Sequence, residues 1–84
     1  MDMRKLVGRN VRRLRQARGL TQEQFAERSG FSQQYISDLE RGRRNPTVVS
    51  MFELASALEA MPVDLIEPHG ADLMDTPEGH AGGR

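Results

Sequence analysis

Four side chains that form hydrogen bonds cluster in one short segment of the sequence: Gln33, Gln34, Tyr35 and Ser37. The glutamine amide carries a donor and an acceptor in one plane, so it can form two hydrogen bonds with the N6 and N7 atoms of adenine. The serine and tyrosine hydroxyls can bond to bases or to phosphates. Because arginines flank the segment on both sides, the pattern predicts a surface where neutral side chains read base edges and cations bind phosphates.

Two helices joined by a tight turn must position these side chains. Thr21 and the glutamine three residues later form a capping-box pattern, which predicts a helix over about residues 22–29. The next helix is expected over residues 32–41, after the short segment Gly30-Phe31-Ser32. A turn this short that contains glycine makes the helices cross at an angle, as in a helix-turn-helix. The second helix of that motif presents its N-terminal residues to the major groove of DNA, and the two glutamines fall there.

Three further helices are predicted around this pair, and no strand. Apolar residues spaced three and four apart between Leu6 and Ala17 indicate the first helix of the chain. Thr47 is expected to cap a fourth helix, and Pro62 suits the first turn of a short fifth helix. We therefore expect one all-α domain over residues 1–67, followed by a flexible, glycine-rich tail over residues 68–84.

The charge is divided unevenly along the chain, although 12 basic and 12 acidic residues cancel in the whole. Residues 1–46 carry eleven basic and five acidic side chains, a net charge of +6, and residues 47–84 carry −6. The positive half coincides with the predicted helix-turn-helix. This asymmetry favours a polyanionic partner that the zero net charge would not indicate.

The composition argues against several other classes of protein. Eighty-four residues leave no room for a deep substrate cavity, and the chain has no cysteine. No apolar run reaches the roughly 18 residues of a membrane span, and no signal-peptide core is present, so we expect a cytoplasmic protein without a membrane partner. The predicted domain contains neither a histidine for a Ser-His-Asp set nor a phosphate-binding loop, so we expect no enzyme activity and no cofactor. We interpret His69 and His80 as tail residues, not as metal ligands.

Several segments of the domain agree together with one known pattern. They are Leu20-Thr21-Gln22, Phe25-Ala26, Ser29-Gly30, Ile36-Ser37-Asp38-Leu39-Glu40-Arg41-Gly42, Arg43-Arg44-Asn45-Pro46, Leu54-Ala55-Ser56-Ala57-Leu58 and Val63-Asp64-Leu65. With this set, residues 5–67 resemble the Cro/CI-type (XRE-family) helix-turn-helix regulators, which include phage repressors and restriction-modification controller proteins. The resemblance implies the compact five-helix fold of lambda-repressor-like DNA-binding domains.

The resemblance also implies DNA contacts for individual positions. Gln33 and Gln34 fall at the principal base-reading positions, and Tyr35 and Ser37 are further base contacts. The residues expected to bind phosphates are Gln22, Ser32, Arg43, Arg44 and Asn45.

Two acidic residues of the third helix receive other roles. Glu40 resembles a glutamate that pairs with an arginine of the first helix, and Arg15 stands at the matching position. A partly buried pair of this kind would orient the recognition helix. We expect Asp38, which phosphates would repel, to pair with Arg41 or Arg28.

Apolar residues after position 50 exceed what one small core can readily bury, and the resemblance implies dimerisation through the fourth and fifth helices. The candidates for the dimer interface are Met51, Phe52, Leu58, Met61, Val63, Leu65 and Ile66. The sequence therefore predicts a transcriptional regulator that binds double-stranded DNA as a homodimer and reads a pseudo-palindromic operator through the major groove. The alternative is an antitoxin-like or adaptor module that binds a protein partner with the same fold. A controller, a phage repressor and an antitoxin remain equally compatible with these residues, as do activation and repression.

Overall fold

Five helices and no strand make up residues 1–70, the part of the chain that the computed structural model describes. The helices are α1 (Met3–Ala17), α2 (Gln22–Ser29), α3 (Gln33–Glu40), α4 (Val48–Ala57) and α5 (Val63–Ile66). The prediction of an all-α fold with five helices is confirmed. Most of the predicted tail, residues 71–84, lies outside the described residues.

Side-chain caps start the first four helices, because the first amides of a helix have no partner within it. Asp2, Thr21, Ser32 and Thr47 each accept a hydrogen bond from a backbone amide in the first turn. The predicted capping box is present, because the side-chain oxygen of Gln24 accepts a 2.9 Å hydrogen bond from the Thr21 amide. At Asp2, desolvation raises the pKa of the carboxyl, but hydrogen bonds from the Arg4 and Lys5 amides and the nearby positive charges outweigh it, so this pKa lies below its ordinary value.

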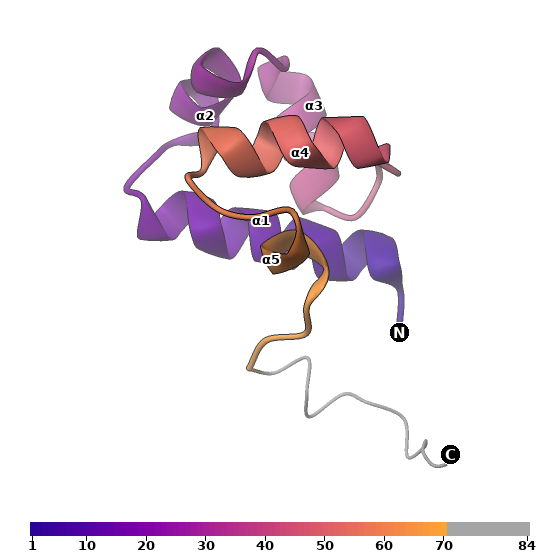
Figure 1. Cartoon of the computed structure of the whole chain (residues 1–84). Coiled ribbons are helices and arrows are strands. Elements are labelled where there is room, and N and C mark those ends of the chain that lie inside the picture. The colour runs from indigo at the N-terminus through magenta and orange to yellow at the C-terminus, as the bar shows by residue number, and fades with distance from the viewer. Residues whose placement is uncertain (71–84) are drawn as a thin grey trace, which may run out of the picture.

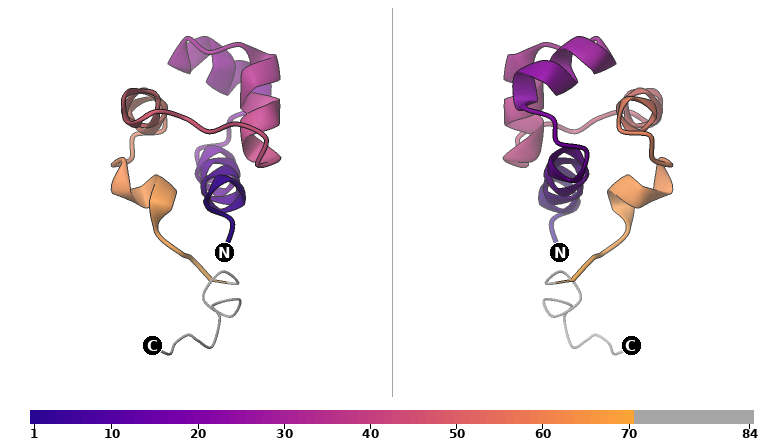
Figure 2. Two further views of the ribbon diagram at one scale, coloured as in Figure 1. Left: turned by 90° about the vertical axis from the view of Figure 1, so that its right-hand side faces the viewer. Right: turned by 90° about the vertical axis from the view of Figure 1, so that its left-hand side faces the viewer.

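The helices surround one apolar core. α1 packs against α3 and α5, and α2 packs against α3 and α4 (Figure 1). Figure 2 looks nearly along the axes of α1 and α4. In these views α4 lies above α1 on one side, and α3 lies above α1 on the other side. The largest apolar side chains without exposed surface are Leu6, Val11, Phe25, Ile36, Leu39, Leu54, Leu58 and Leu65.

Two predicted dimer-interface residues belong to this core. Leu58 and Leu65 are 0% exposed, so their prediction as interface residues was wrong. They face inward because α4 and α5 both turn one face toward the core cluster that includes Phe25. Neither side chain has surface left to contact a second chain.

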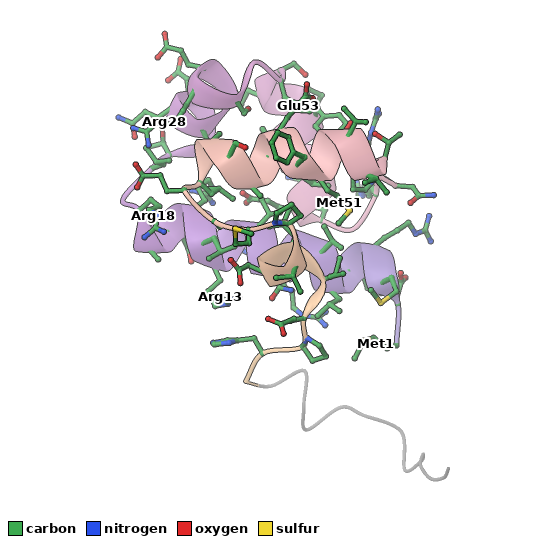
Figure 3. The ribbon with its side chains drawn as sticks, in the orientation of Figure 1. Met1, Arg13, Arg18, Arg28, Met51 and Glu53 are labelled. Carbon is green, nitrogen blue, oxygen red and sulfur yellow. The ribbon has the colours of Figure 1, made fainter. Side chains whose placement is uncertain are left out.

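Polar side chains of α1 hold the short α5 and the end of α4. The Asn10 amide, only 1% exposed, donates to the carbonyls of Leu65 (3.0 Å) and Glu67 (2.8 Å). Arg18 donates to the carbonyl of Leu58 (2.7 Å) near the last turn of α4. Figure 3 shows Arg18 at the carboxyl-terminal half of α1, next to the connection between α4 and α5. These bonds supply partners to carbonyls that the helix ends leave unpaired.

Candidate nucleic-acid interface

The turn between α2 and α3 gives the two helices the angular arrangement that the sequence predicts. Gly30 adopts φ +85°, a left-handed conformation that ends α2 at little cost for glycine. Ser32 then caps α3 by accepting from the Tyr35 amide at 3.0 Å. Gln33 and Gln34 begin α3 and are both exposed, while Ile36 is buried beneath them. The first turn of α3 therefore presents two planar amides to solvent.

A buried ion pair fixes α3 to α1. Arg15 Nε lies 2.6 Å from Glu40 Oε2, and Arg15 Nη2 lies 3.0 Å from Glu40 Oε1. Gln22 at the start of α2 also donates to Glu40 Oε1, at 3.1 Å. The predicted pair is thus present, and one carboxylate joins α1, α2 and α3. The Gln22 amide, predicted to bind a phosphate, has one of its N–H groups committed to this network.

The prediction for Asp38 was wrong. Its carboxylate accepts a 3.0 Å hydrogen bond from Gln34 Nε2, one helical turn earlier, and forms no ion pair with Arg41 or Arg28 in the described residues. Side chains four apart on a helix lie on the same face, so this contact needs no rearrangement of α3. The Gln34 amide keeps its carbonyl oxygen and one N–H for another partner.

The loop after α3 carries three exposed side chains that were predicted to bind phosphates: Arg43, Arg44 and Asn45. The guanidinium carbon of Arg44 lies 4.6 Å from the centre of the Tyr35 ring. Phe31 stacks on the same ring, with 4.8 Å between centroids. Tyr35 is consequently half-buried. No role was predicted for Phe31 from the sequence.

The basic side chains of residues 1–46 do not all lie on one surface of the domain. Arg15 is neutralised by Glu40, Arg18 donates to the end of α4, and Arg13 donates to Asn10 at 3.2 Å. Figure 3 shows Arg13 on α1 and Arg18 just after the last residue of α1, both away from α3. The charge beside the helix-turn-helix therefore comes from fewer arginines than the sum of +6 indicates. The exposed arginines of the helix-turn-helix and of the loop after it are Arg28, Arg41, Arg43 and Arg44.

Residues 1–70 contain no group of three or more histidine, cysteine, aspartate or glutamate residues that could hold a metal ion. None of the helices in the same residues is long and apolar enough to span a bilayer.

A helix-turn-helix with exposed amides on its second helix and exposed arginines in the following loop defines a DNA-binding protein of the helix-turn-helix class. The model of the Helix-turn-helix family HTH_3 matches residues 11–66, and the chain belongs to this family.

Similar proteins agree with this assignment. The chain is 65% identical over 68 residues to the uncharacterized HTH-type transcriptional regulator y4dJ of Sinorhizobium fredii, covering 81% of this chain and 88% of that protein. It is 39% identical over 70 residues to the control protein C.SmaI of Serratia marcescens, covering 83% of each. The crystal structure of the restriction-modification controller protein C.AhdI from Aeromonas hydrophila superposes with a TM-score of 0.71 at 40% identity, covering 74% of this chain and 94% of that one. The resemblance to Cro/CI-type regulators is confirmed, and the protein is a DNA-binding transcriptional regulator of this family.

Proposed function

We propose that this regulator recognises a specific sequence in double-stranded DNA by inserting the N-terminal turn of α3 into the major groove. The observation that carries the proposal is the exposure of Gln33 and Gln34 at the start of α3, on a helix held by the buried pair of Arg15 and Glu40. Each glutamine amide can pair with an adenine edge. Ser37, half-buried one turn later, is the next side chain in reach of the groove.

Contacts to the DNA backbone complete the proposed interface. Arg43 and Asn45 are exposed in the loop after α3, Ser32 caps that helix, and Gln22 begins α2. Polar and cationic side chains at these places would bind phosphates on either side of the groove and fix the register of α3. Arg44, on the same loop, would contact the DNA as well. Residues 1–67 would form the complete DNA-binding unit, acting on DNA in the cytoplasm.

A homodimer is the second part of the proposal. Six large apolar side chains of α4, α5 and their connection are exposed. Two of them, Val48 and Val49, lie in the first turn of α4, and the other four were predicted to lie in the interface: Phe52 (60%), Met61 (64%), Val63 (47%) and Ile66 (40%). A second copy would cover this apolar surface, which a small monomer rarely leaves open to water. Met51 is half-buried and would contribute at its edge.

Phe52 also lines a groove of about 550 Å³ between α2 and α4, together with Arg28 and Glu53 (Figure 3). Through Phe52, this groove borders the exposed apolar surface. In a twofold dimer the two α3 helices would lie about 34 Å apart and read half-sites one turn of DNA apart, which requires a pseudo-palindromic operator.

The experiment begins with selection of bound sequences from random duplex DNA. The selected operator is then measured by fluorescence anisotropy with Gln33→Ala and with Gln16→Ala, an exposed glutamine of α1. Gln33→Ala should weaken binding by about 1–3 kcal/mol and relax the preference at one base pair, while Gln16→Ala should change neither. Arg43→Ala should weaken binding to all sequences and lower the salt slope by about one. Equal affinities for all these variants and the wild type would show that α3 and its loop are not the DNA-binding surface.

A further inference from the structure

Three side chains from different parts of the helix-turn-helix form a continuous stack. Phe31 comes from the turn between α2 and α3, Tyr35 from the first turn of α3, and Arg44 from the loop after α3. The rings of Phe31 and Tyr35 are 4.8 Å apart at an interplanar angle of 28°, and Arg44 lies 4.6 Å over the Tyr35 ring. Phe31 and Arg44 thus both contact the ring of Tyr35, which is half-buried.

This stack changes what Tyr35 can do. A ring that already contacts Phe31 and Arg44 has less of its surface free to stack on a base. Its neighbours Gln33 and Gln34 keep their amides exposed. The ring is instead a platform for a cation, since a guanidinium over an aromatic face is attracted by the negative charge of that face.

The same stack distinguishes Arg44 from Arg43. Both arginines are exposed, but within residues 1–70 the Arg43 guanidinium has no hydrogen bond, ion pair or ring contact. The Arg44 side chain extends from the loop to Tyr35 in the first turn of α3, the turn that also carries the two glutamines. An arginine already held in place loses less conformational entropy when it forms two directed hydrogen bonds. The Arg43 side chain has no such contact, so it would lose more conformational entropy in forming the same bonds.

We propose that Phe31 and Tyr35 are positioning residues that present Arg44 to the major groove, where it reads a guanine through its O6 and N7 atoms. The inference rests on the proposed role of α3 in DNA recognition and replaces the sequence-based prediction of a phosphate contact for Arg44. Paired hydrogen bonds from arginine to O6 and N7 of guanine are the most common specific contact in this groove. In this arrangement Tyr35 acts through Arg44 and not through its own hydroxyl.

The first test compares base preference among variants by repeating the selection from random duplex DNA. Arg44→Ala should remove the preference for guanine at one position of each half-site and weaken operator binding about 5- to 150-fold, the range of a bidentate base contact. Substitution of that guanine by 7-deazaguanine, which lacks N7, should weaken the wild type but not Arg44→Ala. Arg43→Ala, the matched control, should keep the guanine preference. A loss that is equal for all sequences in Arg44→Ala would instead indicate a phosphate contact and overturn the proposal.

The second test separates the ring of Tyr35 from its hydroxyl. Tyr35→Phe keeps the stack and should bind within about twofold of the wild type, whereas Tyr35→Leu and Phe31→Leu should relax the same guanine position. Tyr35→Leu combined with Arg44→Ala should lose at most about twofold more than Arg44→Ala alone, because both changes remove one contact. Additive losses, or a Tyr35→Phe variant as weak as Tyr35→Leu, would overturn the positioning role.

Two controls keep this result distinct from other failures. Circular dichroism of each variant identifies those that do not fold, and Tyr35→Met, which keeps an apolar side chain without a ring, replaces Tyr35→Leu if the latter unfolds. Gln33→Ala serves as the control for α3 itself. Gln33→Ala could relax the sequence preference at one base pair while Arg44→Ala relaxes none. That result would show that α3 reads the DNA but that Phe31 and Tyr35 do not position Arg44 to read a base.

Discussion

Arg15 of α1 and Glu40 at the end of α3 form a two-point ion pair in the interior, with only 11% and 4% of their side chains exposed. The pair determines how the recognition helix lies on the rest of the domain. Glu40 also accepts from Gln22, so the N-terminus of α2 depends on the same carboxylate. The structural pair and the proposed DNA-binding surface are thus coupled through one side chain.

Removing one partner of this pair should be more harmful than removing both. Glu40→Ala leaves the Arg15 guanidinium buried without a counter-charge and should lower the free energy of unfolding by about 3–5 kcal/mol. The double variant Arg15→Met/Glu40→Leu buries no charge and should recover most of that loss. Urea unfolding followed by circular dichroism measures both. A Glu40→Ala variant within 1 kcal/mol of the wild type would mean that the pair does not hold α3.

Gly8 lies where α1 approaches the backbone of α3 most closely. A Cβ atom added at Gly8 would lie 2.5 Å from the Leu39 carbonyl oxygen and 2.9 Å from that of Glu40, and neither backbone atom can rotate away. Gly8→Ala should therefore destabilise the domain by about 1–3 kcal/mol, although alanine is the better helix former. Thermal unfolding should show a midpoint lower by several degrees for each kcal/mol. An unchanged or higher midpoint would mean that α1 and α3 can separate without cost.

Glu59, just after α4, has φ +56° and is the one residue other than glycine with a positive φ among residues 1–70. A side chain in this left-handed conformation costs about 1 kcal/mol relative to glycine, which helix ends prefer at this place. Glu59→Gly should stabilise the domain by about that amount, since its 3.8 Å ion pair with Arg18 is exposed and contributes little. Glu59→Ala is the control, because it removes the ion pair but keeps the Cβ atom. Equal midpoints for the two variants in thermal unfolding would show that the left-handed conformation of Glu59 is not strained.

Local signals in the sequence were sufficient to locate the helices. Thr21, Ser32 and Thr47 each accept a hydrogen bond from the amide three residues later, so the atoms that start a helix lie within one short window of the chain. The match of Arg15 with Glu40 came from the family resemblance, because nothing in the spacing of 25 residues indicates a contact. The sequence therefore predicted the elements and, with the resemblance, one contact between them.

Contacts that depend on how helices pack were not predicted. Leu58, Leu65 and Phe52 are all apolar and all on predicted helices or at their ends, yet only Phe52 is exposed. Which of them faces the core depends on the relative rotation of α4 and α5. Asn10 resembles any polar residue of an amphipathic helix, and its burial follows from the position of α5. The contact of Arg44 with Tyr35 depends in the same way on the path of the loop after α3.

Phe52 offers the sharpest test of the proposed dimer, because it is 60% exposed and its substitution should leave the core intact. Phe52→Glu would place two carboxylates in an apolar interface and should convert a dimer to a monomer in analytical ultracentrifugation, with a thermal midpoint close to that of the wild type. Affinity for the two-half-site operator should fall steeply, while the weak affinity for a single half-site should remain, because each α3 is unchanged. Glu53→Gln, on the same helix and also exposed, is the matched control and should remain dimeric. A wild-type protein that sediments as a monomer while it saturates the full operator would contradict the dimer, and equal operator binding by Phe52→Glu would place any interface elsewhere.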